Sequence, residues 1–394
     1  MMSAMEQAAA ARGEARPDTL QGVDTPCLVL DVARMENNVA RLRGRLGPSG
    51  VSLRPHLKTA KSVEVARRVM ASPAGPATVS TLMEAERFAA AGVRDITYAV
   101  GIAPAKLGRV LDLRARGADV AVVLDTVEQA VAVAAASRAA GDRIPALIEV
   151  DCDGHRSGVL PGDVHGLVAI GRALGEGAEL RGVMTHAGES YSARGPEALR
   201  RCAEGERRAV VEAAAILRGA GLPCPVVSVG STPTAFAAEN FTGVTEVRAG
   251  VFVFFDLVMA GIGACTVGDV AVSVLATVIG HRRDKGWILV DAGWMAMSRD
   301  RGTSRQAVDQ GYGLVCDIAG EPYGDLVVVD ANQEHGIVAV RPGSGGALPD
   351  LAIGDRVRIL PNHACATGAQ HREYRVVRGA SPAVEATWDR FGGW

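Results

Sequence analysis

Eight short apolar or β-branched runs lie between residues 51 and 247, and they restrict the fold of this chain more than any other feature of the sequence. Ala-rich helical segments or loops separate them, and two of these, 82–91 and 127–140, stop at Gly92 and Gly141, as helices often do. Eight strand–helix units are what a closed (β/α)8 TIM barrel requires. An open doubly wound sheet is the alternative, but no G-x-G-x-x-G motif opens any of the helical segments. The runs are 51–53, 78–80, 96–100, 120–124, 146–150, 180–185, 226–229 and 245–247.

The pattern changes after about residue 263, where strand-like runs follow one another without long helices between them. This change indicates a mostly antiparallel β-domain. A polar, irregular segment at 295–313 lies within it, and long loops of this kind often serve function. We therefore expect a loose tail over 1–23, a barrel over 24–263, whose strand at 24–31 could join the second domain, and a β-domain over 264–394. The strand-like runs are 270–279, 287–290, 326–329, 337–340, 356–360 and 374–377.

The composition narrows the class of partner. With 394 residues, 48% of them hydrophobic, the chain can bury a large core, and its net charge of -2 gives no electrostatic reason to bind nucleic acid or an anionic membrane. A small molecule is the expected partner. Seven cysteines without C-x-x-C spacing argue against a disulfide framework and fit a reducing cytoplasm. The first twenty residues lack an apolar stretch, so we predict neither a signal peptide nor a membrane anchor.

A lysine follows the first of the eight runs directly. Lys58 lies in the segment R-P-H-L-K-T-A-K, which spans residues 54–61. Barrel active sites lie at the carboxyl ends of the strands. A lysine that forms a Schiff base needs desolvation or a cationic neighbour, and His56 and Lys61 are close in sequence. Lys58 is therefore the candidate nucleophile, and a solvated surface lysine is the ordinary alternative.

Polar segments also follow later runs. Arg156 comes after the fifth run, the segment H-A-G-E-S-Y at 186–191 after the sixth, and G-S-T-P-T after the seventh. The backbone N–H groups and hydroxyls of Gly230, Ser231 and Thr232 could hold a phosphate, because barrels frequently bind phosphate beyond strands seven and eight. Without that position, G-S-T would be no more than a turn.

A histidine and a cysteine lie close together near the C-terminal end. His363 and Cys365, in P-N-H-A-C, are two residues apart, so in an extended backbone both side chains point the same way. Imidazole and thiolate together favour zinc, and two protein ligands leave the open positions that a catalytic metal needs. The alternative is a free cysteine that acts as a small buried hydrophobe.

Seven motifs, in order along the chain from about residue 24, resemble the D-serine dehydratase and D-threonine aldolase group of fold-type-III, alanine-racemase-like pyridoxal phosphate enzymes. They are T-P-C-L-V-L-D, R-P-H-L-K-T-A-K, H-A-G-E-S-Y, V-G-S-T-P-T, E-V-R-A-G-V-F, D-A-G-W-M-A-M-S and P-N-H-A-C. The resemblance implies a barrel followed by a β-domain, a homodimer and a bound divalent metal.

The resemblance also implies a role for each candidate residue. Lys58 would bind pyridoxal phosphate covalently, Arg156 would face the pyridine nitrogen, and Tyr191 would line the pocket near the cofactor. His363 and Cys365 would hold the metal. The phosphate would be held by Gly230, Ser231 and Thr232.

Two departures from the family pattern are visible. Many members carry a second histidine where this chain has Ala60, and many carry R-P-G-x-Y where it has Arg248, Ala249, Gly250 and Phe252. The second change removes a phenol, so Phe252 is not counted as a phosphate ligand.

We therefore expect a pyridoxal phosphate and metal dependent lyase that eliminates water from a D-β-hydroxy amino acid, like D-serine dehydratase, to give a 2-keto acid and ammonia. Lys58 would remove the α-proton, and zinc or manganese would activate the β-hydroxyl. H-x-C is typical of dehydrating members of the group and H-x-D of cleaving members.

Other functions remain open on the same sequence. They are retro-aldol cleavage as in D-threonine aldolase, dehydration of D-3-hydroxyaspartate, racemisation, and a non-catalytic barrel that only carries the cofactor. In the segment S-R-D-R-G-T-S-R, Arg299, Arg301 and Arg305 could bind a second substrate carboxylate. His335, in N-Q-E-H-G, is a further candidate for the pocket wall.

Overall fold

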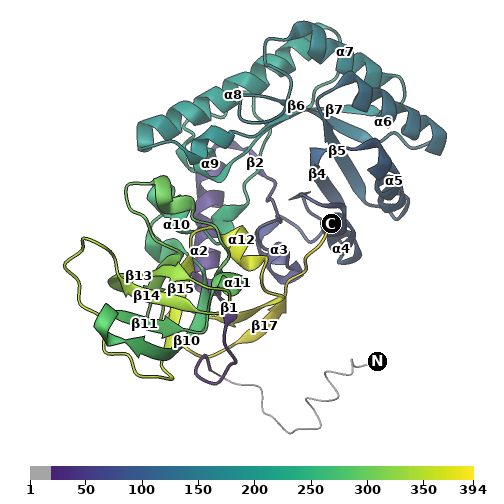
Figure 1. The fold of residues 1–394 in the computed structure, drawn as a ribbon. Helices are drawn as coiled ribbons and strands as arrows, with labels where there is room; N and C mark the ends of the chain where they lie inside the picture. The colour runs from purple at the N-terminus through teal and green to yellow at the C-terminus, as the bar shows by residue number, and fades with distance from the viewer. Residues whose placement is uncertain (1–18) are drawn as a thin grey trace, which may run out of the picture.

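Two sheets organise the protein, which is described here by a computed structural model covering residues 19–394 (Figure 1). The first sheet has eight parallel strands in the order β2-β9-β8-β7-β6-β5-β4-β3. Each of the eight runs predicted from the sequence overlaps one of them, which confirms the barrel class of fold. The strands are β2 (Ser52–Leu53), β3 (Ala77–Val79), β4 (Asp95–Gly101), β5 (Asp119–Leu124), β6 (Pro145–Val150), β7 (Glu179–Thr185), β8 (Val226–Val229) and β9 (Glu246–Val247).

The barrel is closed by the residues that follow β2. His56 forms a parallel bridge with Thr78 of β3. Thr78 N donates to Pro55 O at 2.9 Å, and Leu57 N donates to Thr78 O at 2.8 Å. The two outermost strands of the sheet therefore meet at the segment that contains the candidate lysine. This is why the conformation of that segment depends on both edges of the barrel.

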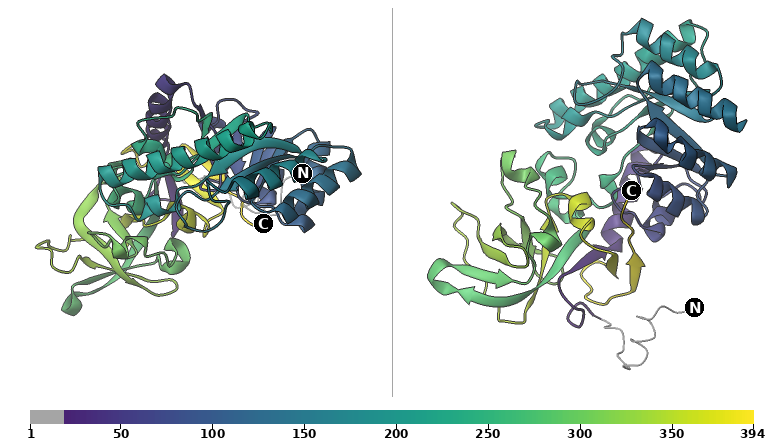
Figure 2. Two further views of the ribbon diagram at one scale, coloured as in Figure 1. Left: turned by 90° about the horizontal axis from the view of Figure 1, so that it is seen from above. Right: turned by 45° about the vertical axis from the view of Figure 1, so that its right-hand side comes forward.

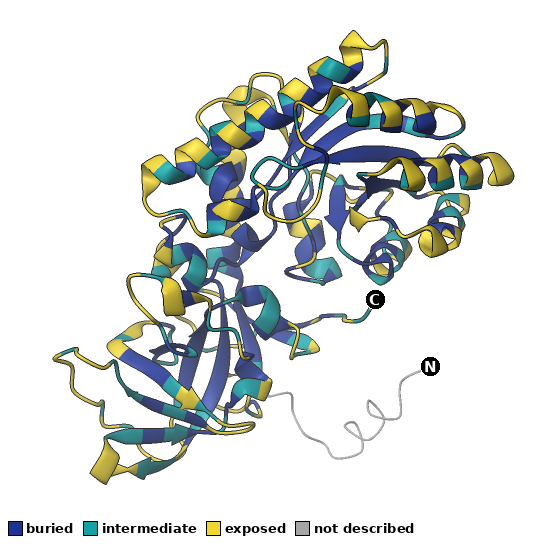
Figure 3. Cartoon of the chain, turned by 45° about the horizontal axis from the view of Figure 1, so that its top comes forward, coloured by how far each residue is buried: buried dark blue, intermediate teal, exposed yellow. Residues whose placement is uncertain are grey.

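Helices cover the outside of the barrel, and their outer faces are exposed while the strands are buried (Figure 3). Local sequence explains their ends: in α6 the Thr126 side chain and Gln129 form a capping box, and Gly141 ends the helix with φ 66°. The helices of this region are α2 (Val32–Leu46), α3 (Val63–Val69), α4 (Leu82–Ala90), α5 (Leu107–Ala115), α6 (Val127–Ala140), α7 (Val164–Gly175), α8 (Pro196–Gly219), α9 (Thr232–Ala237) and α10 (Leu257–Gly261).

The second sheet has nine strands in the order β11-β14-β13-β12-β15-β10-β1-β16-β17, and β10 also pairs with β11. All its pairs are antiparallel except β1 with β16. The six strand-like runs predicted after residue 263 are present. The sequence missed β12 and β17, which have four residues each and no clear alternation. The strands are β1 (Cys27–Asp31), β10 (Val272–Arg282), β11 (Trp287–Val290), β12 (Gly313–Cys316), β13 (Pro322–Ala331), β14 (Gly336–Val340), β15 (Arg356–Pro361), β16 (Glu373–Val377) and β17 (Ala386–Asp389).

The ends of the chain cross between the two sheets. β1 precedes the barrel in sequence but pairs with β10 and β16 of the second sheet. Of the tail expected over residues 1–23, residues 1–18 lie outside the described part of the chain, whereas Leu20 and Val23 pack in a buried cluster with Val29 of β1. Figures 1 and 2 show the C-terminal end beside the barrel, where the ring of Phe391 lies 5.0 Å from that of Phe88.

Two short helices carry loops of the β-domain toward the barrel. They are α11 (Trp294–Met297), at the start of the irregular segment, and α12 (Ala364–Gly368), directly after β15. None of the helices within residues 19–394 has both the length and the apolar character to cross a membrane.

Candidate active site

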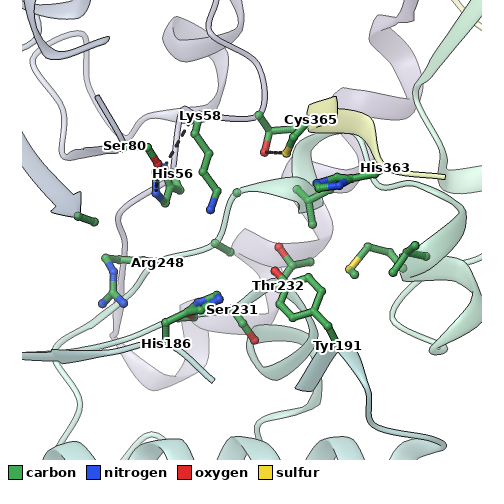
Figure 4. Close-up of a pocket in the computed structure, with 18 of the residues that line it drawn as sticks. His56, Lys58, Ser80, His186, Tyr191, Ser231, Thr232, Arg248, His363 and Cys365 are labelled. Carbon is green, nitrogen blue, oxygen red and sulfur yellow. Dashed lines mark hydrogen bonds between the residues drawn. The ribbon is translucent and has the colours of Figure 1, made fainter. Parts of the chain in front are cut away.

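One cavity of about 460 Å³ lies at the carboxyl ends of the barrel strands, and loops of the β-domain contribute to its wall (Figure 4). All eight residues that the sequence predicts for the site line this cavity, although they come from segments more than 300 residues apart. They are Lys58, Arg156, Tyr191, Gly230, Ser231, Thr232, His363 and Cys365.

Lys58 lies in the turn after β2, and its side chain points into the cavity (Figure 4). The backbone just before it is bonded on both sides. His56 N donates to Ala249 O at 2.7 Å, and Leu57 N donates to Thr78 O at 2.8 Å. The closure of the barrel therefore fixes where the lysine projects.

The β-domain holds the turn that follows the lysine. The Tyr374 hydroxyl donates to Ala60 O at 2.6 Å, and Phe391 N donates to Lys61 O at 2.9 Å. Lys61 has a left-handed backbone with φ 45°, and its ammonium group lies 3.1 Å from the buried carboxylate of Glu84. The orientation of the lysine segment thus depends on contacts from both domains.

His56 does not act as the cationic neighbour that the sequence suggested. Burial lowers its pKa well below the usual value, and the charge of Lys58 lowers it further, so the ring is neutral. Its Nε2 lies 3.3 Å from Ser80 Oγ. Because the charge of Lys61 is also paired, the buried cation that shares the cavity with the lysine is Arg248.

The segment after β8 forms a ring of buried hydroxyls. Ser231 is the N-cap of α9, where its Oγ accepts from Thr234 N at 3.3 Å. The same Oγ lies 3.0 Å from Ser190 Oγ. Thr232 Oγ1 accepts from Phe252 N at 3.2 Å. The Phe252 ring itself lies in the core and outside the cavity wall, in agreement with its exclusion as a ligand.

Gly230 allows a close approach of two backbone segments but has no free N–H group to donate to a ligand. Its N–H donates to Glu206 Oε1 at 2.9 Å, so this N–H is already used, unlike the sequence-based expectation. Its carbonyl accepts from His186 Nδ1 at 2.5 Å. A Cβ at this position would overlap the carbonyl oxygen of Arg248, which explains why a glycine is needed here.

His186 and Tyr191 lie on the same side of the cavity, with ring centroids 6.0 Å apart. Burial lowers the pKa of His186 to about 3. The ring is therefore neutral, and with Nδ1 donating to Gly230 it leaves Nε2 as an acceptor. Burial raises the pKa of Tyr191, so its hydroxyl stays protonated.

Two arginines line the cavity in different environments. The Arg156 side chain is 52% exposed, and its Nη2 lies 3.5 Å from Glu149 Oε1. Arg248 is buried and donates to Ser228 Oγ and Thr185 O, each at 2.5 Å. From the sequence, Arg248 was recognised only as part of a motif, and its place in the site was not predicted. An arginine in an otherwise apolar barrel strand end was the available signal.

His363 and Cys365 approach the lysine segment from the β-domain. His363 Nδ1 lies 2.8 Å from Asp300 Oδ2, and Cys365 Sγ lies 3.2 Å from Thr59 Oγ1. The spacing of the two residues led us to expect an extended backbone through both, but the backbone is not extended there. His363 is the N-cap of α12 and Cys365 is its second residue. The two side chains meet because the chain turns into the helix between them.

Hydrogen bonding between His363 and Cys365 shifts their pKa values in opposite directions, and a metal bound here would replace the proton of the imidazole, since only neutral histidine binds metal. Burial opposes charge on His363, but hydrogen bonds with Asp300 and Cys365 raise its pKa to about 11. Burial likewise opposes ionisation of Cys365, and its contacts with His363 lower the pKa of the thiol below normal. A thiolate is the form that binds metal. No group of three or more His, Cys, Asp or Glu side chains in residues 19–394 is arranged to hold a metal ion.

Hydrogen bonds to two other parts of the chain hold the backbone around this pair. Asp256, the N-cap of α10, accepts from Ala364 N at 3.0 Å, and burial raises the pKa of Asp256 to about 6. Asn362 Nδ2 donates to Asp300 O at 3.0 Å and to Gly311 O at 2.7 Å. The irregular segment thus contributes to the site through Asp300, a residue that the sequence reading did not single out.

Other residues proposed from the sequence lie elsewhere. None of the three arginines of the irregular segment lines the cavity: Arg299 stacks on Trp294 at 4.1 Å, and Arg301 pairs with Asp309 at 2.9 Å. His335 is exposed in the connection between β13 and β14. A role for these side chains in binding a second carboxylate or in forming the pocket wall is therefore not supported.

Comparison with known proteins gives matches over both domains. Residues 30–258 match the family model "Alanine racemase, N-terminal domain", and residues 271–377 match "Putative serine dehydratase domain". The chain is 56% identical over 382 residues to D-threo-3-hydroxyaspartate dehydratase of Delftia sp. (strain HT23), which covers 96% of this chain and 100% of the relative. The solved structure of that enzyme has a TM-score of 0.92 at 56% identity, with the same coverage. D-threonine aldolase of Arthrobacter sp is 31% identical over 381 residues, covering 94% and 93% of the two chains.

Two solved variants of D-threo-3-hydroxyaspartate dehydratase are also similar. One has a cysteine replaced by alanine and is in a metal-free form, with a TM-score of 0.92 at 55% identity over 96% of this chain and all of that chain. The other has a histidine replaced by alanine, two positions earlier, with a TM-score of 0.93 at 54% identity over the whole of both chains. The spacing of the two replaced residues equals that of His363 and Cys365.

Proposed function

Because the chain belongs to the D-serine dehydratase and D-threonine aldolase group of alanine-racemase-like pyridoxal phosphate lyases, we propose that it eliminates water from D-threo-3-hydroxyaspartate. The observation that carries this proposal is that Lys58 and the pair His363 and Cys365 line one cavity in a chain 56% identical to an enzyme of that name. The motifs alone favoured a D-serine dehydratase, with retro-aldol cleavage and dehydration of D-3-hydroxyaspartate as alternatives. The similarity favours the second substrate, because motifs shared by the whole group carry no information on the substrate side chain.

The cavity fits pyridoxal phosphate. Lys58 would hold the cofactor covalently, and the hydroxyls and backbone of Ser231 and Thr232 would contact its phosphate. Gly250 packs closely against the lysine segment, since a Cβ there would lie 3.1 Å from His56. Arg156 would donate to the pyridine nitrogen, and Tyr191 would pack near the ring.

The pair His363 and Cys365 fits a divalent metal, and zinc is favoured because the donors are imidazole and thiolate. Asp300 accepts from His363 Nδ1, which would leave Nε2 to face the metal, as in many carboxylate–histidine–metal arrangements. When bound, the cofactor supplies an electron sink for charge at the substrate Cα, and the metal supplies a Lewis acid for the departing hydroxyl.

The residues of the chain would divide the remaining work. Lys58 Nζ takes the proton from the substrate Cα. As a hydrogen-bond donor to the ring nitrogen, Arg156 would keep that nitrogen from binding a proton, so assistance at the departing hydroxyl would matter more. Neutral His186 keeps the loops after β7 and β8 together through its bond to Gly230 O. Loss of water and hydrolysis of the resulting enamine give oxaloacetate and ammonia.

A product assay tests this function. The holoenzyme with zinc or manganese is given D-threo-3-hydroxyaspartate, D-serine and D-threonine in turn, and keto acid with ammonia is measured against glycine with aldehyde. We expect keto acid and ammonia, the highest kcat/KM with D-threo-3-hydroxyaspartate, and no turnover of L-isomers. Glycine as the main product would contradict the dehydratase proposal and leave the lysine and metal assignments intact.

Retro-aldol cleavage is the second candidate, supported by the 31% identity to D-threonine aldolase over 381 residues. Cys365 weighs against it, because the dehydratase relative also has a cysteine two positions after a histidine. We further propose a homodimer, which light scattering would test, and a reducing cytoplasmic location, which the seven free thiols support.

A further inference from the structure

Glu206 is a buried carboxylate that takes no part in the reaction proposed above. It lies in the middle of α8 and is 3% exposed, and Ala203, Ala209 and Val210 of the same helix are buried around it. Placing a carboxyl group in such surroundings is unfavourable unless hydrogen bonds compensate. Its position therefore calls for a specific set of partners.

Those partners are the backbones of the two loops that carry the cavity wall. Glu206 Oε1 accepts from Ala187 N at 3.1 Å, just after β7, and from Gly230 N at 2.9 Å, just after β8. The Thr234 hydroxyl, in the first turn of α9, is also within hydrogen-bonding reach. One side chain on the helix between β7 and β8 thus connects the loops at the ends of both strands.

Two more bonds join the same loops on the cavity side. His186 Nδ1 donates to Gly230 O at 2.5 Å, and Ser190 Oγ lies 3.0 Å from Ser231 Oγ. The peptide of Gly230 is therefore held at both its N–H and its carbonyl. The next two residues, Ser231 and Thr232, are those proposed to contact phosphate, and their N–H directions follow from the orientation of this peptide.

We infer that Glu206 is a positioning residue for phosphate recognition: it holds the loops after β7 and β8 so that Ser231 and Thr232 meet the cofactor phosphate. The inference rests on the proposed function and adds a residue that lies behind the cavity wall. It predicts that loss of Glu206 weakens binding of the phosphate in particular, and not of the pyridoxal ring.

The test compares pyridoxal 5'-phosphate with pyridoxal, which lacks the phosphate. The full-length protein, freed of cofactor, is titrated with each compound and followed by absorbance. Glu206→Ala and Glu206→Asp, which is one methylene shorter, are expected to raise the Kd for the phosphate form by about tenfold or more, and the Kd for pyridoxal by less than about threefold. Glu206→Gln keeps an acceptor oxygen at the same reach and is expected to stay near wild type.

Val210→Ala is the matched control, because Val210 is fully buried one turn further along α8 and its side chain has no group that can form a hydrogen bond. It should lower the melting temperature without changing the preference for the phosphate form. If Glu206→Ala does not fold, Glu206→Asp gives the answer. Equal weakening of both compounds, or no weakening of either, would overturn the role of Glu206, whereas a wild type that prefers neither compound would overturn the proposed cofactor site itself.

Discussion

The lysine segment and the metal segment reach the same cavity by different means. Lys58 follows β2 of the barrel, and the backbone before it is bonded to the neighbouring strand ends of a parallel sheet. His363 follows β15 of the β-domain, and its surroundings are set by Asp256 and Asp300, which are more than 60 residues away in sequence. The first position follows from strand order, and the second from tertiary contacts. Substitutions in and around the two segments should therefore have different effects. The expected effects range from loss of catalytic activity to a change in the pH dependence of the free energy of unfolding.

The largest effect is expected for Lys58→Ala. Loss of the nucleophilic amine, which is also the proposed base, should lower kcat/KM by more than about a thousandfold, because both roles depend on one group. Borohydride reduction and peptide mapping should place the cofactor label on Lys58 in the wild type. A label on a different lysine would refute the assignment, and Lys106→Ala, outside the cavity, is the control.

Removal of the metal should come next in size. Chelation, or Cys365→Ala, should lower turnover by more than about a hundredfold by removing the Lewis acid. The melting temperature and the absorbance of the bound cofactor should stay nearly unchanged, since two ligands do not hold a domain of this size together. Unfolding or loss of the cofactor after chelation would instead make the metal structural.

Asp300→Asn tests whether contacts from the irregular segment tune the metal pair. The amide keeps the size of the side chain but weakens the hold on His363 Nδ1. We expect metal affinity to fall by about 10- to 100-fold with little change in cofactor affinity. Competition with a chelator of known affinity measures the first and absorbance titration the second. Asp309→Asn weakens the pair with Arg301 and keeps an oxygen that can accept from Gly311 N, and it should leave metal affinity as in the wild type.

The smallest effect concerns the barrel loops and pH. His186 has a pKa of about 3 in the folded protein because it is buried, whereas an unfolded histidine titrates near 6.5. Below pH 6.5 the unfolded chain binds a proton that the folded chain does not, so this residue destabilises the fold as the pH falls from about 6.5 toward 3. At pH 5 the loss is about 2 kcal/mol relative to pH 7.

Urea unfolding at pH 7 and pH 5 measures this effect. His186→Gln should reduce the difference in the free energy of unfolding between the two pH values. His165→Gln changes an exposed histidine of α7 and should leave the difference as it is in the wild type. An unchanged difference in His186→Gln would mean that His186 is protonated in the folded protein.

The sequence by itself determined the barrel and β-domain class of fold and the candidate residues that the structure brings to one cavity. Alternation of apolar runs with helical segments fixes a parallel barrel, because each buried strand needs a run of its own and each crossover needs a helix. Since active sites of such barrels lie at the carboxyl ends of strands, Lys58 and the loops after β7 and β8 could be identified from order alone. His363 and Cys365 were found through a short motif, although the reasoning assumed an extended backbone where the chain turns into α12.

Only the tertiary structure decided which side chains surround those residues and in what charge state. Several features of the site depend on groups that are distant in sequence. They are the neutral ring of His56, the burial of Arg248, the hydrogen bond of Asp300 with His363, and the hydrogen bonds of Glu206 to the loops after β7 and β8. The three arginines of the irregular segment were plausible ligands by composition, yet none of them lines the cavity, and two of them contact Trp294 and Asp309 instead. The physical reason is that strand and helix patterns are set by local burial and periodicity, whereas pKa values and hydrogen bonds are set by which groups the folded chain brings within a few ångströms.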